Sequence, residues 1–332
     1  MKLLITGGAG FIGSNFIRYI LKRHPDYQVV NLDKLTYAGN LENLAEVESD
    51  PRYTFIRGDI CDGDAVRRAA QDCHAIINFA AESHVDRSIS DPAGFLRTDI
   101  FGVYVLLEVA RELGMQRLIQ ISTDEVYGAI AEGAFREDDR LRPSNPYAAS
   151  KAGGELLAAS YWHTYGTPVI ITRATNNIGP HQYPEKMAPL FVTNALEDKP
   201  LPVYGDGGQM RDWIHVEDHC AALDLVLERG QPGEIYNIGD SPVATNLQVA
   251  HMILDKLGKP HGLITHVKDR PGHDRRYAVD SSKLRALGWM RRYDLEAAIS
   301  ATIEWYRNNE AWWRKIKSGE FLEYYRKQYG VS

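Results

Sequence analysis

The sequence has little of several features that mark particular protein classes. Its three cysteines, Cys61, Cys73 and Cys220, include no C-x-x-C pair, so neither a disulfide framework nor a zinc site is expected. The eleven histidines are scattered without the spacing of metal ligands, and no metal is expected. Apolar runs such as Val103–Leu107 are far too short to cross a bilayer.

Positive charge is also in short supply. The chain has 38 basic and 44 acidic residues, and its formal net charge of −6 argues against a general nucleic-acid binder, which needs a basic surface. A few local arginines could still hold a small anionic ligand. The opening residues, MKLLITGGAGFIG, place glycines where a signal peptide needs a continuous apolar segment, so a cytoplasmic location is expected.

The sequence does contain a regular alternation of strands and helices. A length of 332 residues with 44% hydrophobic and 25% charged residues is typical of one large or two modest globular domains. In the first half, short apolar runs alternate with segments of helical periodicity. The predicted strands are Lys2–Ile5, Gln28–Leu32, Tyr53–Arg57, Ala75–Phe79, Arg117–Ile121 and Val169–Arg173. The predicted helices are Ser14–His24, Thr98–Leu113 and Pro146–Tyr165.

This order predicts an α/β protein with a Rossmann-type, doubly wound parallel sheet. Polar or glycine-rich residues follow each predicted strand, and such sheets bind ligands outside the carboxyl ends of their strands. After about Thr175 the pattern loosens into short strands, helices and loops. We therefore expect residues 1–175 to form a cofactor-binding domain that carries the catalytic residues. Residues 176–332 should form a smaller, mixed α/β substrate lobe, with some return of the chain to the sheet edge.

A glycine-rich turn follows the first predicted strand. Gly7, Gly10 and Gly13 let the backbone turn tightly and approach a pyrophosphate, whose charge the start of the next helix favours. Asp33 ends the second strand, where its carboxylate could bind the ribose hydroxyls of a dinucleotide and would repel a 2′-phosphate. The pattern therefore favours NAD over NADP, although Lys34 is a cation that could tolerate the phosphate.

A tyrosine and a lysine lie four residues apart at the start of a predicted helix. Tyr147 and Lys151 therefore share one face of that helix. A phenol with an ordinary pKa of about 10 is a poor base at neutral pH. A neighbouring ammonium and a nicotinamide cation favour the phenolate and lower that pKa. Tyr147 could then take a proton from a substrate hydroxyl while a hydride leaves the same carbon for NAD.

Together these motifs resemble the extended short-chain dehydrogenase/reductase superfamily, and within it the dTDP-glucose 4,6-dehydratases. The resemblance covers nearly the whole chain. In the first half it rests on residues 33–40 (DKLTYAGN), 80–88 (AAESHVDRS), 122–128 (STDEVYG) and 146–151 (PYAASK). In the second half it rests on residues 176–177 (NN), 184–186 (PEK), 204–207 (YGDG) and 269–274 (DRPGHD).

Two adjacent carboxyls, Asp124 and Glu125, discriminate best within that superfamily. Epimerisation needs only the tyrosine and lysine, whereas a 4,6-dehydratase must also remove the proton at C5 and expel the hydroxyl at C6. Glu125 can be the general base at C5 and Asp124 the general acid at C6. Adjacent carboxyls raise each other's pKa unless one is neutral, which suits this division. The resemblance adds a hydrogen bond from Thr123 to the C4 oxygen.

The resemblance also implies the residues that bind the two ligands. The expected catalytic residues are Thr123, Asp124, Glu125, Tyr147 and Lys151. The expected cofactor-binding residues are Gly7, Gly10, Phe11, Ile12, Gly13, Asp33, Lys34, Leu35, Thr36, Asp59, Ile60, Phe79, Ala80, Ala81, Ser83, Thr98, Tyr147, Lys151 and Asn177. The expected substrate-binding residues are Ser83, Thr123, Asn176, Lys186, Met187, Pro202, Val203, Tyr204, Arg211, Asn246, Asp269, Arg270, Pro271, Gly272 and His273.

Within the substrate set, two arginines and a turn carry a chemical argument. Arg211 and Arg270 offer forked donors that suit diphosphate oxygens. Pro271 and Gly272 predict a turn that presents Arg270. The expected ligand is a dTDP-hexose, and the expected product serves deoxysugar biosynthesis, for example of rhamnose. The resemblance further implies a homodimer formed by the helices Thr98–Leu113 and Pro146–Tyr165 and their copies.

Alternatives stay open at this point. A UDP-glucuronate decarboxylase and a 4-epimerase share the fold and the oxidation at C4. Neither needs an acid at C6, and the carboxylate of Asp124 would repel the carboxylate of a glucuronate. A non-catalytic NAD-sensing protein would have no need of both Tyr147 and Lys151. The sequence does not decide between dTDP and UDP or another nucleotide, and it does not identify the pathway that uses the product.

Overall fold

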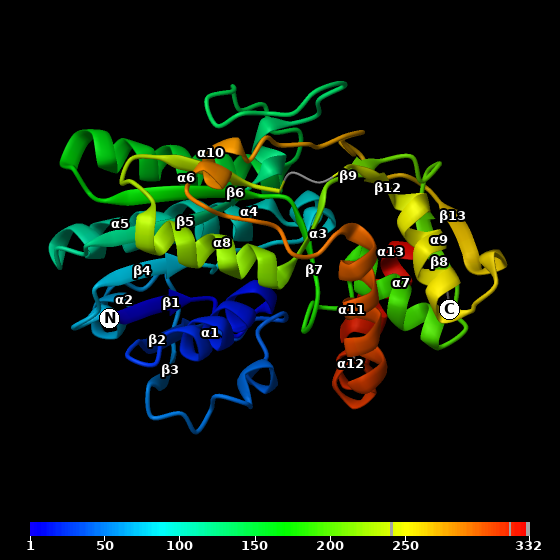
Figure 1. Ribbon diagram of the computed structural model, residues 1–332, viewed down its shortest axis with the longest axis horizontal. Helices are drawn as coiled ribbons and strands as arrows, with labels where there is room; N and C mark the ends of the chain where they lie inside the picture. The colour runs from blue at the N-terminus through cyan, green and yellow to red at the C-terminus, as the bar shows by residue number, and fades with distance from the viewer. Residues whose placement is uncertain (240–241, 319, 330–332) are drawn as a thin grey trace.

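The computed structural model describes residues 1–239, 242–318 and 320–329 and contains a large sheet with a smaller lobe beside it (Figure 1). The seven strands of the sheet lie in the order β11-β6-β5-β4-β1-β2-β3, and every neighbouring pair is parallel. The order reverses between β1 and β4, which is where such sheets bind their ligands. The strands are β1 (Lys2–Thr6), β2 (Gln28–Asp33), β3 (Tyr53–Arg57), β4 (Ala75–Asn78), β5 (Arg117–Thr123), β6 (Val169–Ala174) and β11 (Ile235–Ile238).

Helices cover both faces of the sheet, so the predicted doubly wound α/β fold is confirmed. Alternate residues of each strand face opposite sides: Leu3 and Ile5 belong to one core, whereas Leu4 belongs to the other. The first face is covered by α1 (Phe11–Arg23), α8 (Val216–Arg229) and α10 (Ser282–Ala286). The second face is covered by α2 (Gly63–Ala70), α5 (Val103–Glu112) and α6 (Pro146–Tyr165).

The smaller lobe has its own hydrophobic core, which includes Phe191, Trp213 and Trp313. Its helices are α7 (Met187–Leu196), α9 (Asn246–Leu257), α11 (Leu295–Asn308), α12 (Glu310–Ile316) and α13 (Glu320–Tyr329). Its strands pair two by two, as β7 (Asn176–Ile178) with β10 (Trp213–His215), β9 (Met210–Arg211) with β12 (Ala244–Thr245), and β8 (Leu201–Tyr204) with β13 (Ile264–Val267). Between these segments the chain returns to the sheet as α8 and β11.

Short helical segments connect the larger elements. They are η1 (Leu41–Leu44), α3 (Val85–Ser90), α4 (Pro92–Leu96), η2 (Arg97–Gly102), η3 (Asp124–Tyr127) and η4 (His261–Leu263). Within the described residues, no helix is long and apolar enough to span a membrane.

Two predicted helices differ from the observed ones. The helix predicted from Ser14 begins three residues earlier, because Gly10 serves as its N-cap and Ser14 turns its hydroxyl back to the carbonyl of Phe11. The single helix predicted over Thr98–Leu113 is instead the π-helical segment η2 followed by α5. The oxygen of Asp99 approaches α6 so closely that a Cβ at Gly154 would lie 2.2 Å from it. Local periodicity does not reveal such a contact.

Candidate active site

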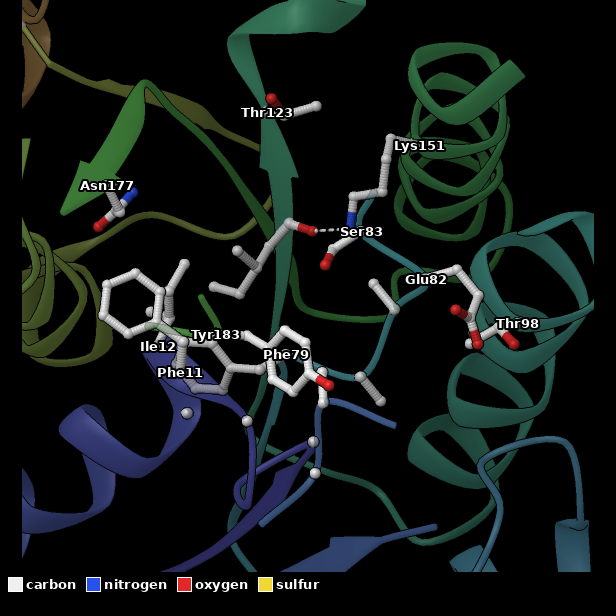
Figure 2. A pocket seen from close by; sticks show the side chains of 18 of the residues that line it. Phe11, Ile12, Phe79, Glu82, Ser83, Thr98, Thr123, Lys151, Asn177 and Tyr183 are labelled. Carbon is white, nitrogen blue, oxygen red and sulfur yellow. Dashed lines mark hydrogen bonds between the residues drawn. The ribbon is translucent and has the colours of Figure 1, made fainter. Parts of the chain in front are cut away.

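A cavity of about 310 Å³ lies at the carboxyl ends of the sheet strands. Residues that follow β1 to β6 line it, and Figure 2 shows Thr123 at the end of β5 and Lys151 on α6. Phe11 and Ile12 enter from the start of α1. Every residue predicted to bind the cofactor lines this cavity except Leu35, and so does every predicted catalytic residue. The structure therefore brings the two sets together in one place.

The glycine turn packs so closely against neighbouring backbone that side chains would not fit. Gly7 has a φ of +69°, and a Cβ there would lie 2.5 Å from the nitrogen of Ala80. A Cβ at Gly13 would lie 2.5 Å from the oxygen of Gly7. Gly10 provides no side-chain cap, and the first turn of α1 has no acidic residue. The first N–H groups of α1 thus face an uncharged space suited to a pyrophosphate.

The acidic residue at the end of β2 is fixed by backbone donors. The carboxylate of Asp33 accepts hydrogen bonds from the nitrogens of Ala9 and Leu35, each 2.8 Å long. Leu35 adopts a φ of 58° in this turn and is not among the lining residues. The ammonium of Lys34 lies 2.8 Å from Asp59, so a carboxylate already engages the cation that complicated the choice between NAD and NADP.

The tyrosine and lysine of α6 share the cavity but do not bond to each other in this structure. Nζ of Lys151 donates to the carbonyl oxygen of Ile121 at 2.6 Å, drawn as a dashed line in Figure 2. Burial raises the pKa of Tyr147 well above its ordinary value, with Glu125 and Asp99 adding to the effect and a hydrogen bond with Thr123 opposing it. The lowered pKa predicted from the sequence, which also depended on a nicotinamide cation, is therefore not a property of the chain by itself, because burial and the nearby carboxyls raise the pKa of Tyr147.

Asp124 is placed as a neutral acid would be. Its side chain is buried, and its Oδ2 has no hydrogen-bond partner among the described residues. Its Oδ1 accepts a 3.2 Å hydrogen bond from Thr123. Burial raises the pKa of Asp124 well above its usual value, and the nearby Glu125 and Asp212 raise it further. The prediction that a neighbouring carboxyl raises the pKa agrees with the effect of Glu125 on Asp124.

Asp99 is a further buried carboxyl, and it supports the helix α6 that carries Lys151. Oδ2 of Asp99 accepts a 2.7 Å hydrogen bond from Ser150, the residue before Lys151. Its Oδ1 accepts a 3.0 Å hydrogen bond from the nitrogen of Glu82, in the loop that lines the cavity. Asp99 therefore ties η2, α6 and the loop after β4 together.

Replacing Asp99 by Asn should flatten the pH dependence of stability in mildly acidic solution. Burial raises the pKa of Asp99 from 3.8 to about 6, so the native state keeps a proton that the unfolded chain releases. The resulting stabilisation is complete below about pH 4 and is lost as the pH rises through about 6, a change of about 3 kcal/mol. Urea unfolding at several pH values measures it. The exposed Asp138→Asn serves as the control, and equal pH profiles for wild type and Asp99→Asn would contradict the assignment.

A second cavity of about 140 Å³ adjoins the first and shares five lining residues with it. The shared residues are Ser83, Glu125, Asn176, Glu185 and Lys186. The predicted substrate-binding residues line one cavity or the other, apart from Asp269, Pro271 and Gly272. These three shape the loop instead: Pro271 and Gly272 form the predicted turn, and Asp269 binds His273 at 2.6 Å.

The two arginines of the second cavity are held in place by the protein. Arg211 donates to the carbonyl oxygens of Met210 and Asp274 and lies over the ring of Tyr277 at 4.2 Å. Arg270 lies 3.4 Å from Asp86, and its Nε is buried without a hydrogen-bond partner among the described residues. Such fixed guanidinium groups suit the oxygens of a diphosphate.

Several lining residues were not predicted as part of the site. His219 reaches the first cavity from α8 and contacts Asn177 at 2.9 Å, and burial lowers its pKa to about 3. Asp86 and Tyr329 line the second cavity, and Glu185 lines both. Asp86 and Glu185 lie in runs that carried the resemblance, so a signal existed for them. His219 and Tyr329 reach the site only through long-range packing.

Known proteins match the chain over almost its full length. The family model for GDP-mannose 4,6 dehydratase matches residues 4–302. A dTDP-glucose 4,6-dehydratase of Streptomyces niveus is 50% identical over 323 residues, which cover 96% of each chain. The low-salt glycan biosynthesis protein Agl12 of Haloferax volcanii is 49% identical over 310 residues, 93% of this chain and 100% of that one.

A solved structure agrees in both fold and sequence. It is the crystal structure of DesIV, a dTDP-glucose 4,6-dehydratase from Streptomyces venezuelae, with NAD and TYD bound. It superposes with a TM-score of 0.93 at 48% identity and covers 96% of this chain and 100% of its own. The chain therefore belongs to the family that the GDP-mannose 4,6 dehydratase model describes, and within that family to the dTDP-glucose 4,6-dehydratases.

Proposed function

We propose that the chain carries out the dTDP-glucose 4,6-dehydratase reaction with the residues of the first cavity. It is an NAD-dependent hydro-lyase. The sugar is oxidised at C4, loses water across C5 and C6, and is reduced at C6 to give the 4-keto-6-deoxyhexose. The observation that carries the proposal is that Tyr147 and Lys151 share one cavity with the adjacent carboxyls Asp124 and Glu125.

The residues of the first cavity would hold NAD. The turn from Gly7 to Gly13 would take the pyrophosphate, Asp33 the ribose hydroxyls, and Asn177 the nicotinamide end. Asp59 would lie near the adenine. When bound, NAD would supply the hydride acceptor for C4 of the sugar and the hydride donor for C6, so the turnover would have no net redox change.

Tyr147 is proposed to remove the proton of the C4 hydroxyl. Thr123 would form a hydrogen bond with the C4 oxygen. The phenol of Tyr147 would face the same hydroxyl group. The ammonium of Lys151, one helical turn away, favours the phenolate by its charge. Together with the positive charge of a bound nicotinamide, it would counter the burial that otherwise keeps the proton on Tyr147.

The carboxyl pair is proposed to carry out the elimination. The C4 ketone acidifies the proton at C5, which Glu125 removes as general base. Asp124, kept neutral by burial, gives its proton to the departing C6 hydroxyl. Oδ2 of Asp124, which has no hydrogen-bond partner in the described part of the chain, would be available for that transfer. Each of these steps contributes about 10²–10⁴-fold to the rate.

The second cavity is proposed to hold the nucleotide. Arg211, Arg270 and Lys186 would bind the diphosphate, and Asn246 has a buried Oδ1 without a partner among the described residues that could accept a hydrogen bond from the ligand. The sugar then points toward Glu125, which borders both cavities. Asp269, Pro271 and Gly272 would shape the loop and would not contact the nucleotide themselves.

Product analysis with three substrates tests the function. The protein is incubated with NAD and with dTDP-glucose, UDP-glucose or GDP-mannose, and the products are followed by mass and by the alkaline absorbance of 4-keto sugars. Loss of one water molecule from dTDP-glucose, without net reduction of NAD, is the expected result. A product of unchanged mass but altered stereochemistry would mean epimerisation and would refute the proposal.

We also propose a homodimer, formed by the helices that the resemblance indicated. Large apolar side chains are exposed along this region, namely Leu96, Phe101 and Tyr104 on α4, η2 and α5, and Leu156 and Tyr165 on α6. Pairing with a second copy would bury them. Light scattering that shows a stable monomer at micromolar concentration would contradict this.

We propose that the two parts of the chain have different binding roles. Residues 1–175 would bind NAD and carry the catalytic groups, and residues 176–332 would mainly bind the nucleotide. Substitutions of residues that line only the second cavity, such as Arg211 and Asn246, should therefore affect dTDP binding but not NAD binding. A cytoplasmic location remains a prediction from the residues of the sequence, and a role in deoxysugar biosynthesis, such as that of rhamnose, remains a prediction from the resemblance.

A further inference from the structure

Asn43 lies behind the glycine turn, outside the first cavity, and its side chain holds one carbonyl group of the turn. Nδ2 of this buried residue donates a 2.9 Å hydrogen bond to the carbonyl oxygen of Ala9, which also accepts a 3.0 Å hydrogen bond from the nitrogen of Asn40. Because a peptide unit is planar, holding this oxygen also fixes the nitrogen of Gly10, the N-cap of α1. Asn43 therefore orients the first free N–H groups of α1, which would receive the pyrophosphate.

Other polar atoms of Asn43 connect it to the smaller lobe and to α1. Its Oδ1 accepts a 3.0 Å hydrogen bond from Nε1 of Trp312, which lies 269 residues further along the chain on α12. Its carbonyl oxygen accepts a hydrogen bond from Arg18 of α1. Beside this contact, Lys315 of α12 forms an ion pair with Glu42. Helix α12, at the lower end of the smaller lobe in Figure 1, is therefore linked to the glycine turn through the amide group of Asn43.

Trp312 is held in place by an aromatic cluster of the smaller lobe. Its ring meets that of Trp305 edge-on, with 5.0 Å between the centroids, and that of His181 at 5.7 Å. Burial and the charge of Arg18 lower the pKa of His181 to about 3, so the ring of His181 is neutral near pH 7. Nδ1 of the neutral ring can therefore accept the 3.0 Å hydrogen bond from Arg18. The cluster thus links Trp312 to α1 by a second route.

The segment that follows β2 forms one wall of the first cavity near this contact. Its lining residues are Lys34, Thr36, Ala38 and Gly39. Asp33, before the segment, binds the nitrogen of Ala9, and Asn40, at its end, binds the oxygen of the same residue. Release of a dinucleotide from between the turn and this segment would require one of them to move, and the hydrogen bonds of Asn43 oppose that movement.

The proposed reaction does not require the cofactor to be released. The hydride taken from C4 of the sugar returns to C6, so the cofactor need not be exchanged between turnovers. A contact that slows the dissociation of NAD would therefore not slow the reaction.

We propose that Trp312, Asn43 and the carbonyl group of Ala9 form a strap from the smaller lobe to the glycine turn, and that this strap slows the dissociation of NAD. The inference rests on the proposed function, in which the first cavity holds NAD. Asn43 and Trp312 are positioning residues that act through Ala9 and do not touch the cofactor. Helix α12 then contributes to the retention of NAD, although it belongs to the lobe that would bind the nucleotide-sugar.

The rate at which bound NAD is lost tests the inference. Protein loaded with radiolabelled NAD is mixed with an excess of unlabelled NAD, and the label that stays with the protein is measured over time. Trp312→Phe keeps an aromatic ring but removes the N–H donor, and it should speed the loss of label about threefold to tenfold, the effect of one hydrogen bond. Asn43→Ala removes two hydrogen bonds and should speed the loss by at least about tenfold. Trp305→Phe makes the same chemical change in the neighbouring ring and should retain the wild-type rate.

Two further measurements separate the retention of NAD from a general effect on the fold. The Kd of dTDP should stay within about twofold of wild type in Trp312→Phe and Asn43→Ala, because the strap lies outside the second cavity. In the double variant, Trp312→Phe should add nothing to the effect of Asn43→Ala, because Trp312 acts through Asn43.

The remaining outcomes distinguish this inference from the proposed function. Loss of label at the wild-type rate in Trp312→Phe and Asn43→Ala would overturn the inference. Effects that add fully in the double variant would also overturn it, and so would equal weakening of dTDP and NAD binding, which would indicate a general effect on the fold. Retention that behaves as expected in a chain that does not turn over dTDP-glucose would count against the proposed function alone.

Discussion

Asp124→Asn should lower the rate of 4-keto-6-deoxy product formation by about 10²–10⁴-fold and leave the oxidation at C4 intact. The amide has nearly the same shape as the carboxyl but has no acidic proton for the departing C6 hydroxyl. The buried site around Oδ2, which has no partner among the described residues, is what favours a neutral acid in the wild type. A rapid-mixing experiment with substrate should therefore still show the near-ultraviolet absorbance of reduced nicotinamide.

Glu125→Gln tests the other half of the elimination. Removal of the general base should stop the loss of the C5 proton, with a similar decrease in product and the same persistence of the C4 oxidation. Asp138→Asn provides a matched control, since this carboxyl is exposed and lies outside both cavities. Full dehydratase activity in either Asp124→Asn or Glu125→Gln would refute the assigned roles.

Local chemistry explains why some elements could be predicted to the residue. The helix Pro146–Tyr165 is bounded by an N-cap at Asn145, whose side chain accepts a 2.9 Å hydrogen bond from Ala148. It ends at Gly166, which has a φ of +69° and is a C-cap that other residues rarely provide. The strand Tyr53–Arg57 was also predicted with its observed bounds. Signals of this kind act within a few residues and need no knowledge of the rest of the fold.

The parts that sequence reasoning missed depend on distant contacts. In the π-helical segment η2, Asp99 forms hydrogen bonds with α6 and with the loop before α3. The periodicity of the sequence does not reveal these contacts. His219 belongs to a helix on the opposite side of the sheet from α6, and its place beside Asn177 emerges only when α8 packs. Tyr329 is a further case, because Tyr204, the ring that it meets at the second cavity, lies more than one hundred residues away.

The burial of the ionisable groups was the property that could least be predicted from the sequence. The rule that a cation four residues away lowers the pKa of a phenol holds only at comparable solvation. In the folded chain, burial raises the pKa of Tyr147 and lowers that of Lys151, so both groups are biased toward their neutral forms. For Asp124 the same effect agrees with the predicted role, since an acid must carry its proton. Burial alone therefore prepares Asp124 for its role, whereas Tyr147 depends on the bound ligands to lose its proton.

Tyr147→Phe should abolish both the oxidation at C4 and everything that follows, with turnover lowered by at least about 10³-fold. The phenyl ring fills the same volume, so the binding of NAD and of dTDP should stay within about twofold of wild type. Neither the absorbance of reduced nicotinamide nor any product should form, in contrast to Asp124→Asn. Comparison of Tyr147→Phe with Asp124→Asn by the absorbance of reduced nicotinamide therefore separates the redox step from the elimination.

The control for this substitution lies on the same helix. Tyr165→Phe makes the same chemical change at an exposed position of α6 and should retain wild-type turnover. If Tyr147→Phe still oxidised its substrate at an appreciable rate, another group would have to accept the C4 proton. Lys151, Lys186 and His219 are among the titratable groups that line the cavity, and burial lowers the pKa of all three. A surviving rate that disappears when Lys151 is also replaced by Ala would then identify Lys151 as the base.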